Sequence, residues 1–252
     1  MGKKATVYLI PGERSVGRLA AELAKKGFNL VWEMDFSGEQ VHLANNLAPA
    51  VVVGVVDETD VRAMTALQRF KVPIVTLAGR EWNLLAPHAQ VEYLLSRDRC
   101  PIIFGATEEP DLQELCRLRK EIVNQACREY GVPEPSVVTI SRTCKKARQT
   151  MAELLRQQPP PFALCAFNDI VALAALVALY DLGVAVPEAV SVIGHDNTKI
   201  AELSNPQLTS VGMESPDLDE QLIASFISLC LGKPASQIVA LSAPKVFARA
   251  SA

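Results

Sequence analysis

Short apolar runs alternate with amphipathic stretches along the chain. Runs of mostly Val, Ile, Leu and Ala bounded by turn residues indicate buried strands. Eight segments have this character: Ala5–Ile10, Leu30–Met34, Ala50–Val56, Pro73–Leu77, Pro101–Phe104, Ser136–Ile140, Phe162–Phe167 and Val190–Ile193. Other segments carry mixed polar and apolar faces typical of helices: Val16–Lys26, Thr59–Phe70, His88–Ser96, Asp111–Tyr130, Ala147–Gln157, Asp169–Leu182 and Pro216–Leu231. Strands that alternate with helices predict an α/β fold, with parallel sheets covered by helices.

Polar residues follow two neighbouring predicted strands at the point where each strand ends. Asn168 comes after Phe162–Phe167 and is suited to cap the helix that begins at Asp169. Asp196 follows Val190–Ile193 in a turn. Ligands of parallel α/β sheets bind at the carboxyl ends of the strands, because helix N-termini and unpaired loop amides gather there. The sequence therefore predicts a binding site that includes these two strand ends.

Charge and composition limit the classes of function. The 252 residues could form one large domain or two lobes, and 49% of them are hydrophobic. The net charge of −3 offers no basic surface for a phosphate backbone, so we expect no DNA binding by this chain alone. No apolar run is long enough to cross a bilayer, and Met1 leads into a strand without a secretory segment. These features predict a cytoplasmic protein with no membrane partner.

Metal, cofactor and enzyme chemistry are not expected. The cysteines form no CxxC pair and are interpreted as reduced core residues of a cytosolic protein: Cys100, Cys116, Cys127, Cys144, Cys165 and Cys230. The histidines His42, His88 and His195 are too far apart in sequence to suggest a metal site. No nucleophile elbow, phosphate-binding lysine loop or dinucleotide fingerprint is present. We therefore predict that the protein is not an enzyme and needs no cofactor.

Several motifs occur in succession towards the C-terminus. They are Ala-Phe-Asn-Asp-Ile-Val-Ala-Leu-Ala-Ala-Leu from Ala166, Val-Pro-Glu-Ala-Val-Ser-Val-Ile-Gly-His-Asp-Asn from Val186, Pro-Gln-Leu-Thr-Ser-Val from Pro206, and Arg-Ala-Ser from Arg249. Together they resemble the effector-binding core of the lac and purine repressor family of bacterial transcription regulators. The resemblance is strongest over residues 160–211.

The resemblance implies a type I periplasmic-binding-protein-like fold. Such a fold has two similar lobes, each a parallel sheet flanked by helices, joined by three crossover segments, with the effector in the cleft between the lobes. The implied N-terminal lobe comprises residues 1–80 plus 212–240, and the C-terminal lobe comprises 81–211 plus 241–252. We expect the crossovers near Arg80, Val211 and Leu241.

The implied function is effector sensing by a homodimeric transcription regulator. A small molecule would bind between the lobes and control a helix-turn-helix headpiece that is absent from this chain and is its only route to DNA. A solute-binding protein of an uptake transporter shares the fold and is the alternative. A third interpretation is that the pocket has degenerated and that the domain only mediates dimerisation.

Three residues match effector-binding positions of the family. Arg119 lies where the family places an arginine that forks onto effector hydroxyls or carboxylates, although it could be an exposed helix arginine instead. Asp196 matches an acidic residue that accepts hydrogen bonds, although it could merely form a turn. Asn168 can donate and accept, a capacity compatible with a role as a helix cap.

Other residues of the expected site depart from the family pattern. The Asn-Pro-aromatic segment after the first strand is missing, and Arg14 lies in the replacement. Trp82 and Asn83 stand where the family has Val-Asp-Asn; Trp82 could stack on a ring or pack in a core or interface. Arg142 lies near a position that is often aromatic in sugar-binding members. These arginines suggest an anionic effector, such as a sugar phosphate or a carboxylate, although a sugar remains possible.

Overall fold

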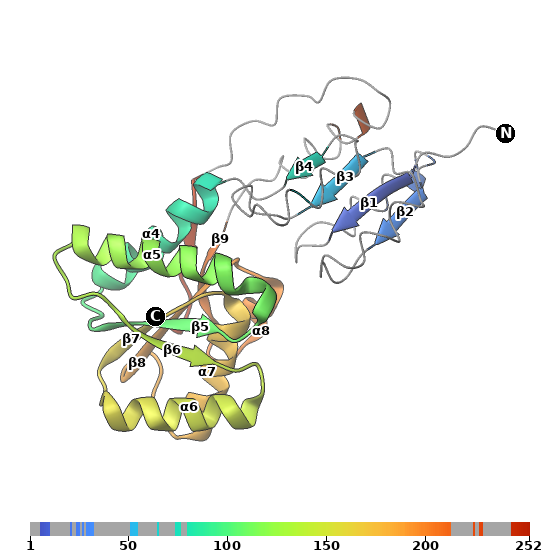
Figure 1. The fold of residues 1–252 in the computed structure, drawn as a ribbon. Coiled ribbons are helices and arrows are strands. Elements are labelled where there is room, and N and C mark those ends of the chain that lie inside the picture. The colour runs from blue at the N-terminus through green and yellow to red at the C-terminus, as the bar shows by residue number, and fades with distance from the viewer. Residues whose placement is uncertain are drawn as a thin grey trace. The chain divides into compact units, whose positions relative to one another are not determined.

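The chain forms two compact units. The computed structural model describes residues 80–212 and 243–252 continuously and, elsewhere, the strands at 6–10, 29–32, 51–54 and 74–76 with a few single positions. One unit comprises Met1–Arg80 with Ser215–Ser242, and the other Glu81–Glu214 with Ala243–Ala252. Each unit contains its own sheet (Figure 1).

The first unit contains a four-stranded parallel sheet. Its strands are β1 (Thr6–Ile10), β2 (Asn29–Trp32), β3 (Val51–Gly54) and β4 (Ile74–Thr76), in the order β2-β1-β3-β4. Each lies within or overlaps a strand expected from the sequence. The expected helices at 16–26, 59–70 and 216–231 fall largely outside the described residues, and Arg14, His42 and Cys230 fall wholly outside them.

The second unit is built on a six-stranded sheet. Its strands are β5 (Ile102–Thr107), β6 (Ser136–Ile140), β7 (Phe162–Ala166), β8 (Val190–His195), β9 (Thr209–Gly212) and β10 (Lys245–Phe247). They lie in the order β10-β9-β8-β7-β5-β6, and all neighbours are parallel except β10 with β9. The central strands β5, β7 and β8 are buried along their whole length, which explains their continuous apolar runs.

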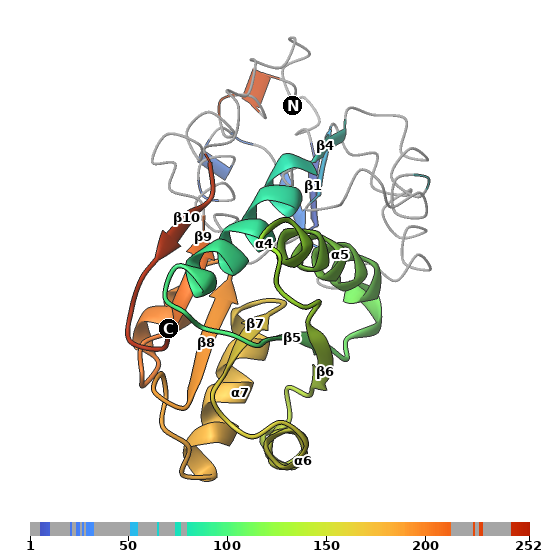
Figure 2. The same ribbon diagram turned by 90° about the vertical axis from the view of Figure 1, so that its left-hand side faces the viewer.

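Helices cover both faces of this sheet. They are α4 (Arg80–Leu95), η1 (Pro110–Leu112), α5 (Gln113–Glu129), α6 (Cys144–Gln157), α7 (Asp169–Asp181) and α8 (Lys199–Leu203). In two views, α4 and α5 lie on one face and α6 and α7 on the other (Figures 1 and 2). This arrangement confirms the predicted α/β class.

Three details of the sequence-based element assignment were wrong. The helix expected at His88–Ser96 begins at Arg80 and contains Pro87, a residue type that usually ends or kinks a helix. Strands β9 and β10 were not expected, since β9 carries Thr209 and Ser210 inside the core and β10 is only three residues long. The short helix α8 was also missed.

The cysteines divide into two groups. Cys116, Cys127 and Cys165 are buried and free, as expected, and burial raises the pKa of the Cys127 thiol to about 11. Cys100 and Cys144 are exposed, so the assignment of these two to the core was wrong. Cys144 begins α6 and Cys100 precedes β5, and such element ends lie at the surface.

Over the described part of the chain, no group of three or more potential ligands could hold a metal ion.

No helix in the described ranges is long and apolar enough to cross a bilayer.

Replacement of a central core residue should destabilise the fold. Leu164 lies on β7 and is fully buried, whereas Leu203 on α8 is 83% exposed. Leu164→Ala should lower the free energy of unfolding by about 2–5 kcal/mol, because it removes buried methyl groups and leaves a cavity. Leu203→Ala makes the same chemical change at the surface and should cost less than about 0.5 kcal/mol in urea denaturation. Equal losses would contradict this packing.

Candidate functional site

Arg119 lies at the carboxyl edge of the second sheet. It projects from the inner face of α5, one helical turn from the buried Cys116 and Val123, and its side chain is only 7% exposed. Its Nη1 donates to the carbonyl oxygen of Phe167 at 2.7 Å, and the guanidinium carbon lies 4.8 Å from the centre of the Phe167 ring. Arg119 is therefore a buried residue that contacts the end of β7, and not an exposed helix arginine.

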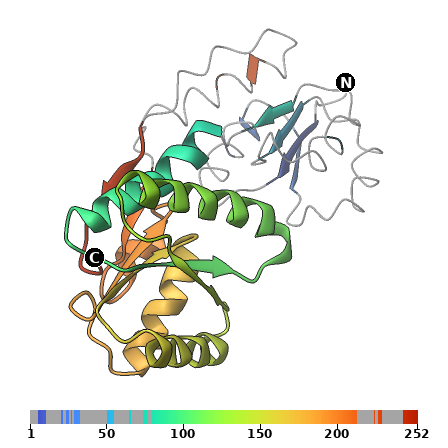
Figure 3. The ribbon, with the colours of Figure 1, turned by 60° about the vertical axis from the view of Figure 1, so that its left-hand side comes forward.

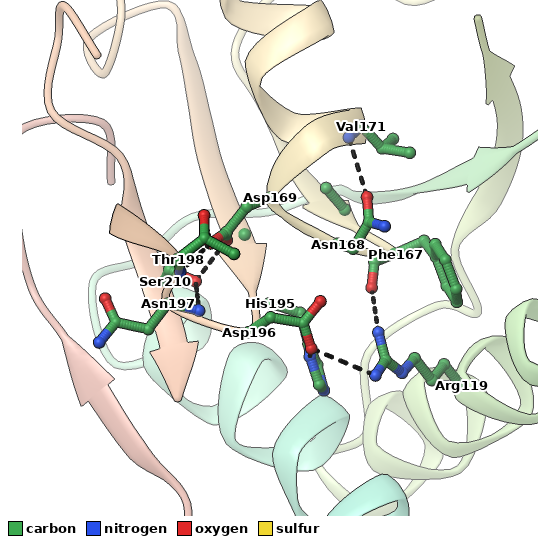
Figure 4. A network of polar contacts seen from close by, with 12 residues as sticks. Arg119, Phe167, Asn168, Asp169, Val171, His195, Asp196, Asn197, Thr198 and Ser210 are labelled. Carbon is green, nitrogen blue, oxygen red and sulfur yellow. Dashed lines mark hydrogen bonds and ion pairs between the residues drawn. The ribbon is translucent and has the colours of Figure 1, made fainter. Parts of the chain in front are cut away.

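Arg119 also meets the end of the neighbouring strand. Its Nη2 lies 3.4 Å from Oδ1 of Asp196, which follows β8 (Figure 4). Arg119 Nε is buried and has no hydrogen-bond partner among the described residues. Buried polar groups are normally paired, and an unpaired one calls for a specific explanation, of which a functional role is one. Arg119 thus joins two strand ends while one of its donors remains unmatched.

Asn168 caps α7 through its side-chain oxygen. Its Oδ1 accepts a hydrogen bond from the backbone N–H of Val171 at 2.9 Å, and its backbone is extended, as in a helix N-cap. The side chain is partly exposed, and no contact among the described residues engages its Nδ2 group. The cap therefore uses the acceptor of the amide and leaves the donors available to a ligand.

Asp196 stands in a conformationally costly turn. Asp196 and Asn197 have φ values of 96° and 45°, a region that costs non-glycine residues roughly 1–2 kcal/mol each. The backbone N–H of Asp196 donates to the carbonyl of Val211 at 2.8 Å, and its Oδ1 lies 2.8 Å from Nδ1 of the buried His195. The Asp196 side chain is 27% exposed, so its carboxylate is held by protein contacts and still reaches solvent.

Two buried polar residues that were not predicted as site residues support these strand ends. Gln90 of α4 donates through Nε2 to the carbonyls of Ala166 at 3.0 Å and Gly194 at 2.9 Å, beyond the last register pair of β7 and β8. Asp169, the first residue of α7, is buried and accepts hydrogen bonds from Thr198. In the sequence, Gln90 is one polar residue among others on a predicted helix, and Asp169 is an acidic residue in a first helical turn. Neither feature predicts a contact with the two strand ends.

The remaining predicted site residues are not brought together with Arg119. Arg142 is 59% exposed and pairs with Glu109 at 3.1 Å, and no contact in the described part of the chain joins it to Arg119. Trp82 and Asn83 lie on α4, but their side chains fall outside the description, as does all of Arg14. The structure therefore assembles Arg119, Asn168 and Asp196.

Comparison with known proteins agrees with this architecture. The model of the family "Periplasmic binding protein-like domain" matches residues 91–252. The HTH-type transcriptional regulator DegA of Bacillus subtilis is 40% identical over 88 residues, which are 34% of this chain and 26% of that protein. The HTH-type transcriptional repressor CytR of Escherichia coli is 28% identical over 153 residues, which are 60% of this chain and 44% of that protein. The chain thus covers under half the length of these relatives.

The fold is also found among solved structures. A LacI family transcriptional regulator from Arthrobacter sp. FB24, in complex with lactose, superposes with a TM-score of 0.72 over 98% of this chain and 99% of that one, at 24% identity. The relatives are of the kind whose effector-binding core the sequence resembles, so that resemblance is confirmed. With the family model matching more than half of its residues, the chain belongs to the family of periplasmic binding protein-like domains.

Proposed function

We propose that this chain is the effector-binding and dimerisation core of a cytoplasmic transcription regulator of the lac repressor type. The observation that carries the proposal is the buried Arg119, which bonds to the end of β7 and pairs with Asp196 after β8. An arginine that joins two strand ends at the carboxyl edge of a parallel sheet supports a ligand site there. The names of the relatives favour a regulator over a transporter's solute-binding protein.

The effector that best fits these contacts is neutral and carries hydroxyl groups. A hydroxyl can donate to the Asp196 carboxylate, and a neighbouring hydroxyl can accept from the Arg119 guanidinium or the Asn168 amide. The positive charge of Arg119 is balanced by Asp196, and that of Arg142 by Glu109. Of the candidate arginines that the structure describes, Arg119 and Arg142 each have an acidic partner, which favours a sugar-like effector over the anion suggested by the sequence. The lactose in the related Arthrobacter regulator is a precedent.

The effector would act by shifting a conformational equilibrium. A ligand changes the balance between two states only when it binds them with different affinities. Asp196 and Asn168 lie on separate loops, so an effector that contacts both favours the conformation in which the loops are correctly spaced. In a homodimer, this preference would be transmitted to the helix-turn-helix headpieces and change their affinity for DNA.

Thermal unfolding with a panel of compounds tests the effector class. Neutral sugars, sugar phosphates, carboxylates, purines and nucleosides are added in turn, and a true effector at a hundredfold excess over its Kd should stabilise the chain by about 2.7 kcal/mol. We expect the shift with a neutral sugar, and we expect Arg119→Met and Arg119→Lys to abolish it. Arg142→Met is the matched control and should leave the shift unchanged.

Two outcomes of the panel would contradict the proposal. A shift with an anion alone, lost in Arg142→Met, would replace the neutral effector by the anionic one. The absence of a shift with every compound would favour a domain that serves only for dimerisation.

Substitutions of Asn168 separate its role as a helix cap from its contact with an effector. Asn168→Ser keeps a side-chain acceptor for the N–H of Val171 and should change the free energy of unfolding by less than about 0.5 kcal/mol. Asn168→Ala removes the cap and should cost about 1 kcal/mol. Both variants lack the Nδ2 donors, so both should weaken binding of the effector found by the panel, as measured by titration calorimetry. Normal binding by Asn168→Ser would show that the amide donors make no effector contact.

A further inference from the structure

Asp169 is a buried carboxylate that accepts three hydrogen bonds from two separate segments. It is 1% exposed. Its Oδ2 accepts from the backbone N–H of Thr198 at 2.6 Å and from the Thr198 hydroxyl at 2.8 Å. Its Oδ1 accepts from the Ser210 hydroxyl on β9 at 2.5 Å (Figure 4). All three partners are donors, so the ionised carboxylate is the form that this arrangement fits.

Ser210 extends the contact to the turn that carries Asp196. The Ser210 hydroxyl donates to Asp169 and accepts from the backbone N–H of Asn197 at 3.0 Å. Asp169 therefore holds Asn197 through Ser210 and holds Thr198 directly. The two residues before Thr198, Asp196 and Asn197, both have positive φ. A turn in such a conformation persists only when its surroundings fix it, and Asp169 supplies two of the fixing contacts.

Asp169 packs so closely against β8 that Gly194 has no room for a side chain. A Cβ atom at Gly194 would lie 2.3 Å from Asp169 Oδ1 and 2.9 Å from the Leu208 side chain. The carboxylate therefore lies against the backbone of β8 two residues before Asp196. This close approach ties the start of α7 to the strand that ends in the candidate site.

We propose that Asp169 is a positioning residue of the effector site, which fixes the turn Asp196–Thr198 so that the Asp196 carboxylate meets Arg119. The inference rests on the proposed function for its effect on binding. Its effect on the turn itself does not depend on that function. Asp169 does not touch the effector in this account, and it acts through Ser210 and Thr198.

The electrostatics of the site give the positioning role a pH dependence. Burial raises the pKa of Asp169 to about 6, and the nearby charge of Asp196 acts in the same direction. The other charged or titratable groups at this edge are His195 at the end of β8, Arg119 of α5, Lys199 and Glu202 of α8, and Arg249 after β10. Protonation below about pH 6 neutralises the acceptor that Thr198 and Ser210 share, and so loosens the turn.

The stability of the whole fold should respond to this group in the opposite sense. Because the folded pKa is raised, Asp169 favours folding most below its unfolded pKa near 4, and that contribution is lost as the pH rises through about 6. The difference in unfolding midpoint between the wild type and Asp169→Asn should therefore decrease as the pH rises from 5 to 7. Over the same range the turn should become more ordered. The two readouts separate a positioning role from a merely stabilising one.

The test compares Asp169→Asn, Ser210→Ala and Thr198→Val with Ser191→Ala. Ser191 is a buried serine on β8 that donates to the carbonyl of Pro187 at 3.1 Å, away from the site. The first readout is the amide hydrogen exchange of Asn197 and Thr198 in the protein without ligand, measured by NMR. We expect exchange at least about tenfold faster in the three site variants, because each loses a hydrogen bond of the network that joins Asp169, Ser210 and the turn. Ser191→Ala should leave the exchange unchanged.

The second readout is the affinity for lactose as the probe, across pH 5 to 8. Wild-type affinity for lactose should fall as the pH drops through about 6. Asp169→Asn should bind lactose at least about tenfold more weakly, and its affinity should not change with pH, although His195 and Asp196 remain. Unchanged exchange at Asn197 and Thr198 in Asp169→Asn would overturn the proposal, whether or not lactose binds. Faster exchange in a protein that does not bind lactose would support the positioning of the turn and reject lactose as effector.

Discussion

The parallel pairing of β7 with β8 is the constraint on which the site depends. The two strands run in register from Phe162 with Val190 to Cys165 with Ile193, so both end at the same edge of the sheet. Asn168 and Asp196 follow these ends on separate loops. Arg119 then donates to the carbonyl of Phe167, directly after β7, and pairs with the carboxylate of Asp196, directly after β8. Without this pairing, the polar residues would lie on unrelated loops. Figure 3 shows the sheet of the second unit with helices on both of its faces.

Several features of this edge cost folding free energy, and such features cluster at functional sites in proteins. The region contains two consecutive non-glycine residues in the left-handed conformation, a buried arginine with an unmatched donor, and a buried carboxylate whose pKa is raised by its burial. Each of these features is unfavourable by itself. The central strands β5, β7 and β8, which are buried along their whole length, support this edge. The result is an arrangement of donors and acceptors that is held by contacts within the protein.

The sequence predicted the elements with strong periodicity and the residues at strand ends. Strand β6 has the expected bounds, and α7 differs from its prediction by one residue. Contacts between residues far apart in the chain could not be predicted from the sequence. Nothing in the order of residues shows that Gln90 of α4 reaches the ends of β7 and β8, or that Arg142 is paired with Glu109. The short strand β10 gains its hydrogen bonds from β9, and such pairing leaves no local pattern.

The central claim is that an effector binds at the edge formed by Arg119, Asn168 and Asp196. The most direct measurement is a two-dimensional NMR titration of the whole chain with lactose that follows the Arg119 Nε–Hε signal, the Asn168 side-chain amide and the backbone amide of Asn197. The account predicts that these three signals shift together with one saturation curve. Binding that shifts signals elsewhere in the chain and leaves these three unchanged would contradict it.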